Sequence, residues 1–152
     1  MTSLGDSFPQ ELKNEFVSRN IKSGVVIKAF VTDTKPPKEK RFILISEKYD
    51  KLVFATVFIN SEINPNIFKN EEVKKLHVLF EKNERAYIDH PSYVDCSQLI
   101  FRDKSWLEGI LNEDSSRLIG ELSSEDFEAI KGVIKSAKTI PISKKKEFGL
   151  YL

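Results

Sequence analysis

The chain has 152 residues and a net charge of +1 at pH 7, so it fits one domain and carries no strong overall field that would attract nucleic acid. Hydrophobic residues make up 40% of the sequence, which is enough to build a buried core. The single cysteine, Cys96, excludes an internal disulfide and a cysteine-based zinc cluster. Because the overall charge is close to zero, a nucleic-acid partner would have to bind to a local basic patch.

No apolar run approaches the length of a membrane-spanning helix, and the first residues lack the basic and then apolar layout of a signal peptide. A lone cysteine is also typical of a reducing compartment. These features predict a cytoplasmic protein with no membrane partner. Asp89, His90 and Asp95 are too few and too unspecific for a metal site, and no cofactor is expected.

A short helix is the first element expected, within an N-terminal arm at residues 1–23. Ser7 can cap its start, and Leu12, Phe16 and Val17 then fall on one helical face. The arm is expected to pack against the main body as a structural element.

Three strands are expected next, because apolar and β-branched residues cluster between turn-forming segments. They cover residues 24–31, 41–46 and 52–59. A polar loop at residues 32–40 contains two adjacent prolines, which exclude a helix or a central strand there. A tight turn separates the second and third strands, which should form a hairpin, and residues 60–70 should form a loop.

Further strands are expected at residues 73–80, 87–88 and 93–101. From Ser123 the hydrophobic period changes from two to 3.6, which predicts an amphipathic helix over residues 123–138 with Ser123 as its cap. The buried face of this helix should carry Phe127, Ile130, Val133, Ile134 and Ala137.

The whole pattern predicts a mainly β protein with flanking helices, in which five or six antiparallel strands form a small barrel. Three parts follow along the chain: the helical arm at residues 1–23, the barrel with its C-terminal helix at residues 24–138, and a tail at residues 139–152. The tail is basic and then apolar. It is expected either to add an edge strand or to cover part of a groove.

Several segments carry a family resemblance. The stretch Ser92-Tyr93-Val94-Asp95-Cys96-Ser97-Gln98-Leu99 is followed by Asp103-Lys104, by Leu107 and by Leu118-Ile119-Gly120-Glu121-Leu122-Ser123. Together these segments resemble the C-terminal half of the PemK/MazF-like toxins, a family of endoribonucleases built on an SH3-like barrel. Gly24 and Arg41 are similar to the glycine that opens the family's first strand and to the basic residue that starts its second. Phe42 stands where the family usually has proline.

The resemblance spans about residues 24–138 and implies a metal-independent endoribonuclease that cuts single-stranded RNA by attack of the 2′-hydroxyl group. In that role Arg41 would stabilise the transition state. Ser61 is the best match to the family's hydroxyl-bearing residue, and Ser61 or its neighbour Asn60 would orient the phosphate. The resemblance also implies a homodimer and a cognate antitoxin protein.

The residue types fit this chemistry, because RNA carries its own nucleophile and the planar fork of an arginine matches phosphate oxygens. Lys35, Lys38 and Lys40 surround Arg41 and would attract an RNA backbone, although a lysine-rich loop is most often a solvated turn. His90 is a further RNA-binding candidate, since a histidine suits proton transfer near neutral pH. The alternative for His90 is a turn residue with a local hydrogen bond.

A second hypothesis assumes the same barrel without catalytic activity. The protein would then be a non-catalytic module that binds nucleic acid or another protein.

Cys96 lies in the middle of a predicted strand, where a buried and inert thiol is expected. His77 is expected to be a structural or surface residue.

Overall fold

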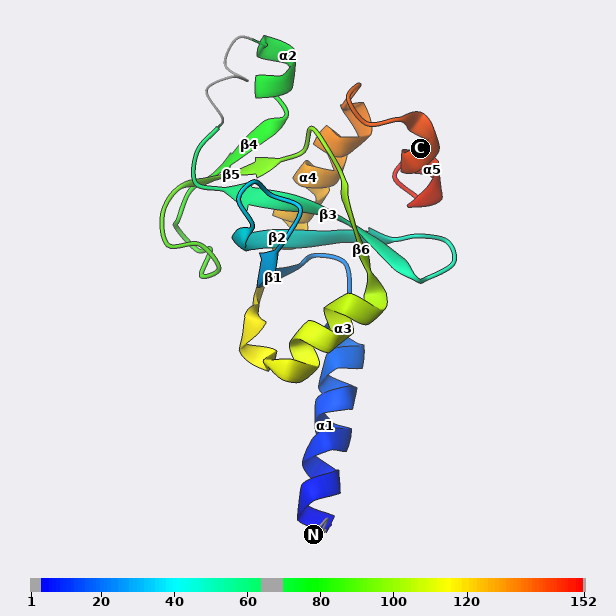
Figure 1. The fold of residues 1–152 in the computed structure, drawn as a ribbon. Helices are drawn as coiled ribbons and strands as arrows, with labels where there is room; N and C mark the ends of the chain where they lie inside the picture. Colours follow the sequence, from blue (N-terminus) through cyan, green and yellow to red (C-terminus); the bar gives the residue numbers. More distant parts are fainter. Residues whose placement is uncertain (1–3, 64–69, 152) are drawn as a thin grey trace.

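The computed structural model describes residues 4–63 and 70–151, with the backbone alone for residues 4–10 and 13. Its centre is a strongly curled seven-stranded sheet whose strands pair in an antiparallel way (Figure 1). The strands are β1 (Val25–Val31), β2 (Lys38–Glu47), β3 (Val53–Asn60), β4 (His77–Phe80), β5 (Ser92–Asp95), β6 (Ile100–Asp103) and β7 (Leu118–Glu121). The helices are α1 (Leu4–Asn20), α2 (Glu71–Lys74), α3 (Lys104–Glu113), α4 (Ser124–Ser136) and α5 (Ile142–Glu147). The predicted mainly β fold with flanking helices is confirmed, but the described residues form seven strands where five or six were predicted.

β3 is the centre of the topology, because three strands pair with it. β2 runs along one of its edges, and β5 and β6 share the other edge. β5 meets the C-terminal end of β3, where Ile59 lies opposite Val94, and β6 meets the first half of β3, where Phe54 lies opposite Arg102. β1 and then β7 continue beyond β2, and β4 lies outside β5.

The single strand predicted at residues 93–101 is in fact two strands, because a turn at Asp95 divides it. The Asp95 carboxylate accepts hydrogen bonds from the backbone N–H and the hydroxyl group of Ser97, and from the side-chain amide of Gln98. Such a turn gives the backbone a local partner in place of the strand ladder. β5 therefore ends at Asp95, and β6 begins only at Ile100.

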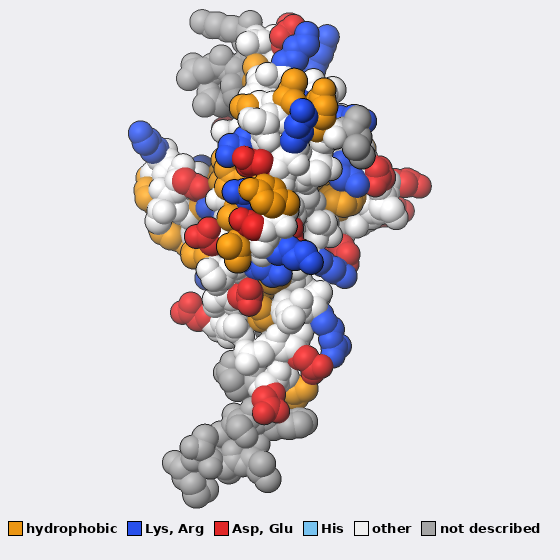
Figure 2. Space-filling model, turned by 90° about the vertical axis from the view of Figure 1, so that its right-hand side faces the viewer, with side chains coloured by type: hydrophobic (Ala, Val, Ile, Leu, Met, Phe, Trp, Pro, Cys, Tyr) orange, Lys and Arg blue, Asp and Glu red, His pale blue; other side chains and the backbone are white. Residues whose placement is uncertain are grey.

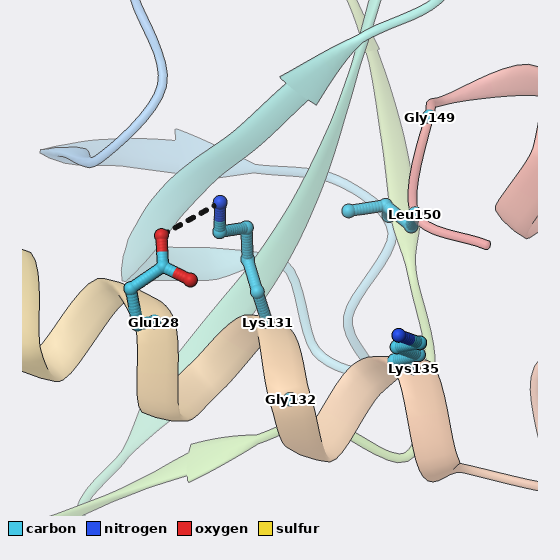
Figure 3. A pocket seen from close by; sticks show the side chains of 6 residues that line it. All are labelled: Glu128, Lys131, Gly132, Lys135, Gly149 and Leu150. Atoms are coloured by element: carbon cyan, nitrogen blue, oxygen red, sulfur yellow. Dashed lines mark ion pairs between the residues drawn. The ribbon is translucent and has the colours of Figure 1, made fainter. Parts of the chain in front are cut away.

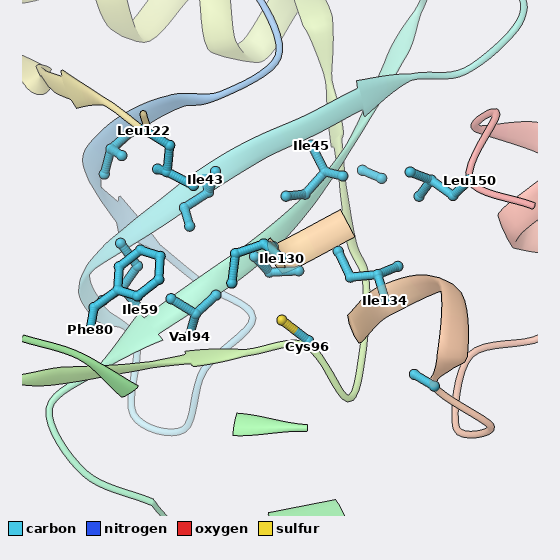
Figure 4. Close-up of a cluster of buried hydrophobic side chains, with 14 of the residues drawn as sticks. Ile43, Ile45, Ile59, Phe80, Val94, Cys96, Leu122, Ile130, Ile134 and Leu150 are labelled. Carbon is cyan, nitrogen blue, oxygen red and sulfur yellow. The ribbon is translucent and has the colours of Figure 1, made fainter. Parts of the chain in front are cut away.

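Both faces of the sheet are covered, and the alternation of side chains along β2 shows how. Ile43 and Ile45 point into a core beneath α4, whereas Phe42 and Leu44 point into a core beneath α1 and α3. The first, here the α4 core, includes Val26, Ile43, Ile45, Ile59, Phe80, Val94, Cys96, Leu122, Ile130, Ile134 and Leu150 (Figure 4). The second, here the α3 core, includes Val17, Ile21, Ile27, Phe42, Leu44, Phe54, Phe58, Leu107 and Leu111.

α4 confirms the helix predicted from Ser123 onward. The Ser123 hydroxyl accepts a hydrogen bond from the backbone N–H of Asp126 at 3.1 Å, which is the expected N-terminal cap. The predicted buried face is confirmed as well: Ile130, Ile134 and Ala137 are fully buried, and Phe127 and Val133 pack partly buried against the same core.

Two predicted strands are wrong in part or in whole. The segment at residues 73–80 is a strand only from His77, because Asn70 accepts hydrogen bonds from the N–H groups of Glu72 and Val73 and starts the short helix α2. Residues 87–88 form a turn, and their apolar side chains are buried in the α4 core without any strand pairing. A short apolar run marks burial there, and it does not fix the backbone conformation.

The tail is a helix, so the predicted edge strand is wrong. α5 is followed by Phe148 and Leu150, whose side chains are buried in the α4 core. The ammonium group of Lys145 is buried, and it donates hydrogen bonds to the carbonyl groups of Lys135 at 2.8 Å and Ala137 at 2.7 Å. These bonds satisfy carbonyl groups at the C-terminal end of α4, where a helix lacks partners of its own.

Helix α3 was not expected from the sequence pattern. Leu107 and Leu111, four residues apart, are its buried residues, and the alternation seen in the strands is absent here. α1 begins at Leu4 and projects from the body, with Val17 and Ile21 holding its C-terminal end in the α3 core (Figure 1). The side chain of Ser7, predicted to cap this helix, lies outside the described residues. No helix of the described chain is both long and apolar enough to cross a membrane.

Candidate functional site

Arg41 lies near the start of β2, on the face of the sheet that carries the α4 core. Lys28 of β1 and Ile59 of β3 are its neighbours across the strands. The side chain is 25% exposed, and its Nη2 atom lies 3.6 Å from Oδ2 of Asp89. Its Nε atom is buried without a hydrogen-bond partner among the described residues. Because a quarter of the side chain is exposed, the outer part of the guanidinium group can meet an anionic ligand, whereas the buried Nε atom cannot.

Asp89 joins Arg41 to the second predicted site residue, His90. Asp89 and His90 lie in the loop between β4 and β5, and Nδ1 of His90 is hydrogen-bonded to Oδ1 of Asp89. The hydroxyl group of the buried Ser92 donates to the backbone carbonyl of His90 at 2.9 Å, which fixes the loop at the start of β5. The hydrogen bond with His90, and next the charge of Arg41, lower the pKa of the Asp89 carboxyl group, so it is ionised at neutral pH.

This arrangement brings together the parts of an acid–base centre at an open surface. Asp89 holds one nitrogen of the His90 ring, and no described residue bonds the other nitrogen, which can therefore face a ligand. Arg41 places a permanent positive charge on the other side of Asp89. The three residues can thus bind an anion and move a proton beside it.

The remaining predicted residues lie elsewhere. Lys40 and Asn60 point to the opposite face of the sheet from Arg41, because neighbouring residues of a strand alternate between faces. The Lys40 ammonium group is hydrogen-bonded to the Asn60 side chain and lies 5.0 Å from the ring centre of Phe58. Burial, and next the charge of Lys38, lower the pKa of Lys40. Arg41 and Asn60 therefore do not share one catalytic centre in this structure.

Ser61, Lys35 and Lys38 are all exposed at the same end of the sheet. Ser61 lies in the bend that follows β3, Lys35 lies in the loop after β1, and Lys38 begins β2. These positions leave the two lysines open to a polyanion. Ser61 adjoins the segment at residues 64–69, which is outside the described chain.

The buried pair His77 and Asp95 is a structural feature that the sequence did not reveal. Nδ1 of His77 lies 2.9 Å from the carbonyl oxygen of Val73, and Nε2 lies 3.4 Å from Oδ1 of Asp95. The pair ties β4 and β5 to α2. Cys96, next in sequence to Asp95, is fully buried, so the expected burial of this thiol is confirmed, and burial raises its pKa to about 12.

The surface outside this site is mixed in character. Figure 2 shows one face on which hydrophobic side chains gather near the middle, with basic and acidic groups interspersed among them. A pocket between α4 and the C-terminal segment is lined by Glu128, Lys131, Gly132, Lys135, Gly149 and Leu150 (Figure 3). Glu128 and Lys131, both on α4, pair with each other at 3.0 Å. The other side of the pocket is formed by Gly149 and Leu150 of the tail, so the pocket marks the contact between α4 and the tail.

Asp89 is the member of the Arg41 cluster that the sequence reasoning did not name as a site residue. Its signal was its place next to His90 in a turn-forming stretch, Asp89-His90-Pro91. The contact with Arg41 depends on the path of the loop after β4, which no periodicity encodes. Comparison with known proteins adds no further assignment, since no protein-family model and no curated protein matches the chain.

Proposed function

We propose that the protein is a metal-independent endoribonuclease that acts on single-stranded RNA, with an SH3-like barrel of the PemK/MazF type as its scaffold. The observation that supports this proposal is the Arg41–Asp89–His90 cluster, in which two independently predicted site residues share one carboxylate. A nuclease that uses the RNA 2′-hydroxyl group needs a proton acceptor and a cation beside the phosphate. The cluster supplies both.

In the proposed reaction, the 2′-oxygen attacks the adjacent phosphorus and the bond to the 5′-oxygen breaks. His90 takes the proton from the 2′-hydroxyl group, and Asp89 keeps the imidazole ring oriented. Arg41 hydrogen-bonds the phosphate oxygens as negative charge develops on them. The leaving 5′-oxygen takes a proton from solvent, and the products are a 2′,3′-cyclic phosphate and a 5′-hydroxyl end.

Lys35 and Lys38 would attract the RNA backbone to this end of the sheet. Ser61 would contact the phosphate of a neighbouring nucleotide. The resemblance carries two further proposals, a homodimer and a cognate antitoxin that occupies the RNA site. Sedimentation at micromolar concentration tests the dimer, since a clean monomer contradicts it.

The test is cleavage of an end-labelled single-stranded RNA in the presence of EDTA. Arg41→Ala should lower the rate by about 10²–10³, as the loss of one transition-state donor does. His90→Ala should lower it by about 10²–10⁴, the usual contribution of an acid–base group. Ser61→Ala should cost less than Arg41→Ala, because a neutral hydrogen bond is weaker than a charged one.

Arg19→Ala is the matched control, because this arginine is exposed on α1 and pairs only locally with Glu15 among the described residues. It should cleave at the parental rate. A substrate with 2′-deoxyribose at the scissile position should resist cleavage. Parental cleavage by Arg41→Ala would contradict the assigned role of this residue.

A non-catalytic binding module is the second candidate, and one observation favours it. Lys40 and Asn60 bond to each other on the face opposite to Arg41, so a predicted RNA-binding residue and a predicted catalytic residue do not converge on the proposed centre. The parent protein would then bind single-stranded RNA in a salt-dependent way and cleave no RNA at all. The same assay therefore separates the two candidates.

A further inference from the structure

A pocket on another part of the surface is lined by Phe30, Thr32, Phe101, Arg102, Asp103 and Trp106. It lies where the end of β1 approaches β6 and the start of α3, and none of its residues belongs to the Arg41 cluster. Its volume is about 260 Å³. That is slightly below the roughly 300–1,000 Å³ of typical ligand sites, so the pocket suits one small ring system.

Three of its residues are aromatic and unusually exposed for their type. Phe30 is 55% exposed, Phe101 is 42% exposed and Trp106 is 37% exposed. The Phe101 ring already stacks on Phe148, with 5.1 Å between the ring centres, and the Lys144 ammonium group lies 5.3 Å from its centre. Phe30 and Trp106 are therefore the rings that can serve as a stacking platform for a flat ligand. The rings alone would accept any flat apolar molecule, so the polar groups decide its chemistry.

Arg102 forms the charged wall of the pocket. Its side chain is only 8% exposed, and its Nη1 atom pairs with Oδ2 of Asp33 at 2.9 Å. The guanidinium carbon lies 5.3 Å from the ring centre of Trp106 and 5.1 Å from that of Phe42. The Nε atom of Arg102 is buried and has no hydrogen-bond partner among the described residues. A buried cation already lies against the Trp106 ring, so a second cation would be repelled.

Asp103 and Thr32 add polar groups at the same pocket. Asp103 stands at the N-cap of α3, yet its carboxylate makes no capping hydrogen bond. An aspartate at this position normally uses its carboxylate to cap the helix. Because Asp103 does not, its exposed carboxylate is available as a hydrogen-bond acceptor. Thr32 contributes an exposed hydroxyl group.

We propose that this pocket binds a single nucleobase, stacked on the exposed rings of Phe30 and Trp106, with an edge rich in N–H donors turned toward Asp103. Guanine fits best, because its N1–H and N2–H groups are adjacent donors that one carboxylate accepts together. This inference goes beyond the proposed cleavage, since it concerns binding at residues that the reaction does not use.

Trp106 makes the test direct, because it is the only tryptophan in the chain and therefore the sole source of tryptophan fluorescence. Guanosine 5′-monophosphate is titrated into the full chain, with excitation at the red edge of the tryptophan band where the nucleotide is transparent. A saturable change in Trp106 emission is expected. Ribose 5-phosphate, which lacks a base, should give no change, and uridine 5′-monophosphate should bind more weakly.

Phe30→Ala should weaken guanosine monophosphate binding by roughly 5- to 100-fold, the loss expected for one stacking ring. Asp103→Asn should reduce the preference for guanine over uracil. Tyr49→Ala is the matched control, since Tyr49 is exposed at the β2–β3 turn and is not part of the pocket. All three positions are exposed, so folding should survive, and circular dichroism checks that it does.

Three results would overturn the proposal. The first is no saturable emission change with guanosine monophosphate. The second is an equal response to ribose 5-phosphate, which would assign binding to the phosphate group. The third is equal affinity of the Phe30→Ala and Tyr49→Ala variants. RNA cleavage plays no part in this measurement, so its outcome is independent of the proposed nuclease activity.

Discussion

At the scale of single residues, Arg85 and Asp126 form an ion pair in which two arginine nitrogens bond the two carboxylate oxygens. Nε and Nη2 of Arg85 each donate to one carboxylate oxygen of Asp126 at 2.9 Å, and both side chains are partly buried. The hydrogen bonds from Arg85 lower the pKa of Asp126 from its ordinary value of 3.8, and burial opposes them. The pair joins the loop after β4 to the first turn of α4.

Asp126→Asn should therefore lower the free energy of unfolding by about 1–3 kcal/mol at pH 7, the usual range for hydrogen bonds to charged groups. A carboxyl group whose pKa is lowered by folding stabilises the protein fully above its ordinary pKa and loses this effect as the pH falls through the lowered value. The difference between parent and variant should shrink between pH 5 and pH 2, approximately the range over which such groups take up protons. Urea unfolding across this pH range measures it.

Glu128→Gln is the control for that prediction, because Glu128 is exposed on the same helix and pairs with Lys131. Its effect should stay within about 0.5 kcal/mol at every pH. A cost of Asp126→Asn that is the same at pH 2 and pH 7 would show that the carboxylate charge does not matter.

Single residues also show where sequence reasoning ends. The sequence predicted a loop up to Lys40, but β2 begins at Lys38, so that the last part of the predicted loop is strand. Strand parity then places Lys40 and Arg41 on opposite faces, which the predicted boundary had concealed. The contact between Arg41 and Asp89 was not predictable, because it joins a strand to a loop about fifty residues later through backbone conformations that follow no period. Sites built partly from loops are for this reason the least visible in a sequence.

At the scale of elements, α4 was the most predictable part of the chain because its cap and its buried face agree. Ser123→Ala should remove the hydrogen bond to the Asp126 N–H group and lower the free energy of unfolding by about 1 kcal/mol. Ser124→Ala is the control, since this exposed serine is the next residue and is not the cap. Denaturant midpoints of the two variants give the comparison, and equal midpoints would mean that the cap contributes nothing.

α2 and α3 were hidden for different reasons. α2 has four residues and depends on Asn70 as a cap, so its apolar residues belong to no helical period long enough to detect. α3 buries only Leu107 and Leu111, and it follows β6 without a break at Asp103. The predicted boundaries between elements were wrong where a polar side chain, such as that of Asp95, hydrogen-bonds the backbone and turns the chain.

At the scale of the whole molecule, the two cores share one sheet, and the tail is part of that unit. Alternate residues of β2 and β3 point into the α4 core and the α3 core. Each core with its covering helices forms one layer, and both layers lose their packing surface if the sheet unfolds. Phe148, in the tail, is buried in the α4 core, whereas Trp106 in α3 stacks on Phe42 of the other core. One cooperative unfolding transition should follow from this arrangement.

Phe148→Ala tests that expectation, because it damages one layer while Trp106 fluorescence reports on the other. The loss of a buried phenylalanine side chain should lower the free energy of unfolding by about 3–5 kcal/mol. Since the layers share the sheet, the fluorescence midpoint in urea should fall together with the far-UV circular dichroism midpoint. Tyr151→Ala, at an exposed position of the same tail, should change both by less than about 0.5 kcal/mol. A fluorescence midpoint that stays at the parental value while the dichroism midpoint falls would show that the two layers unfold separately.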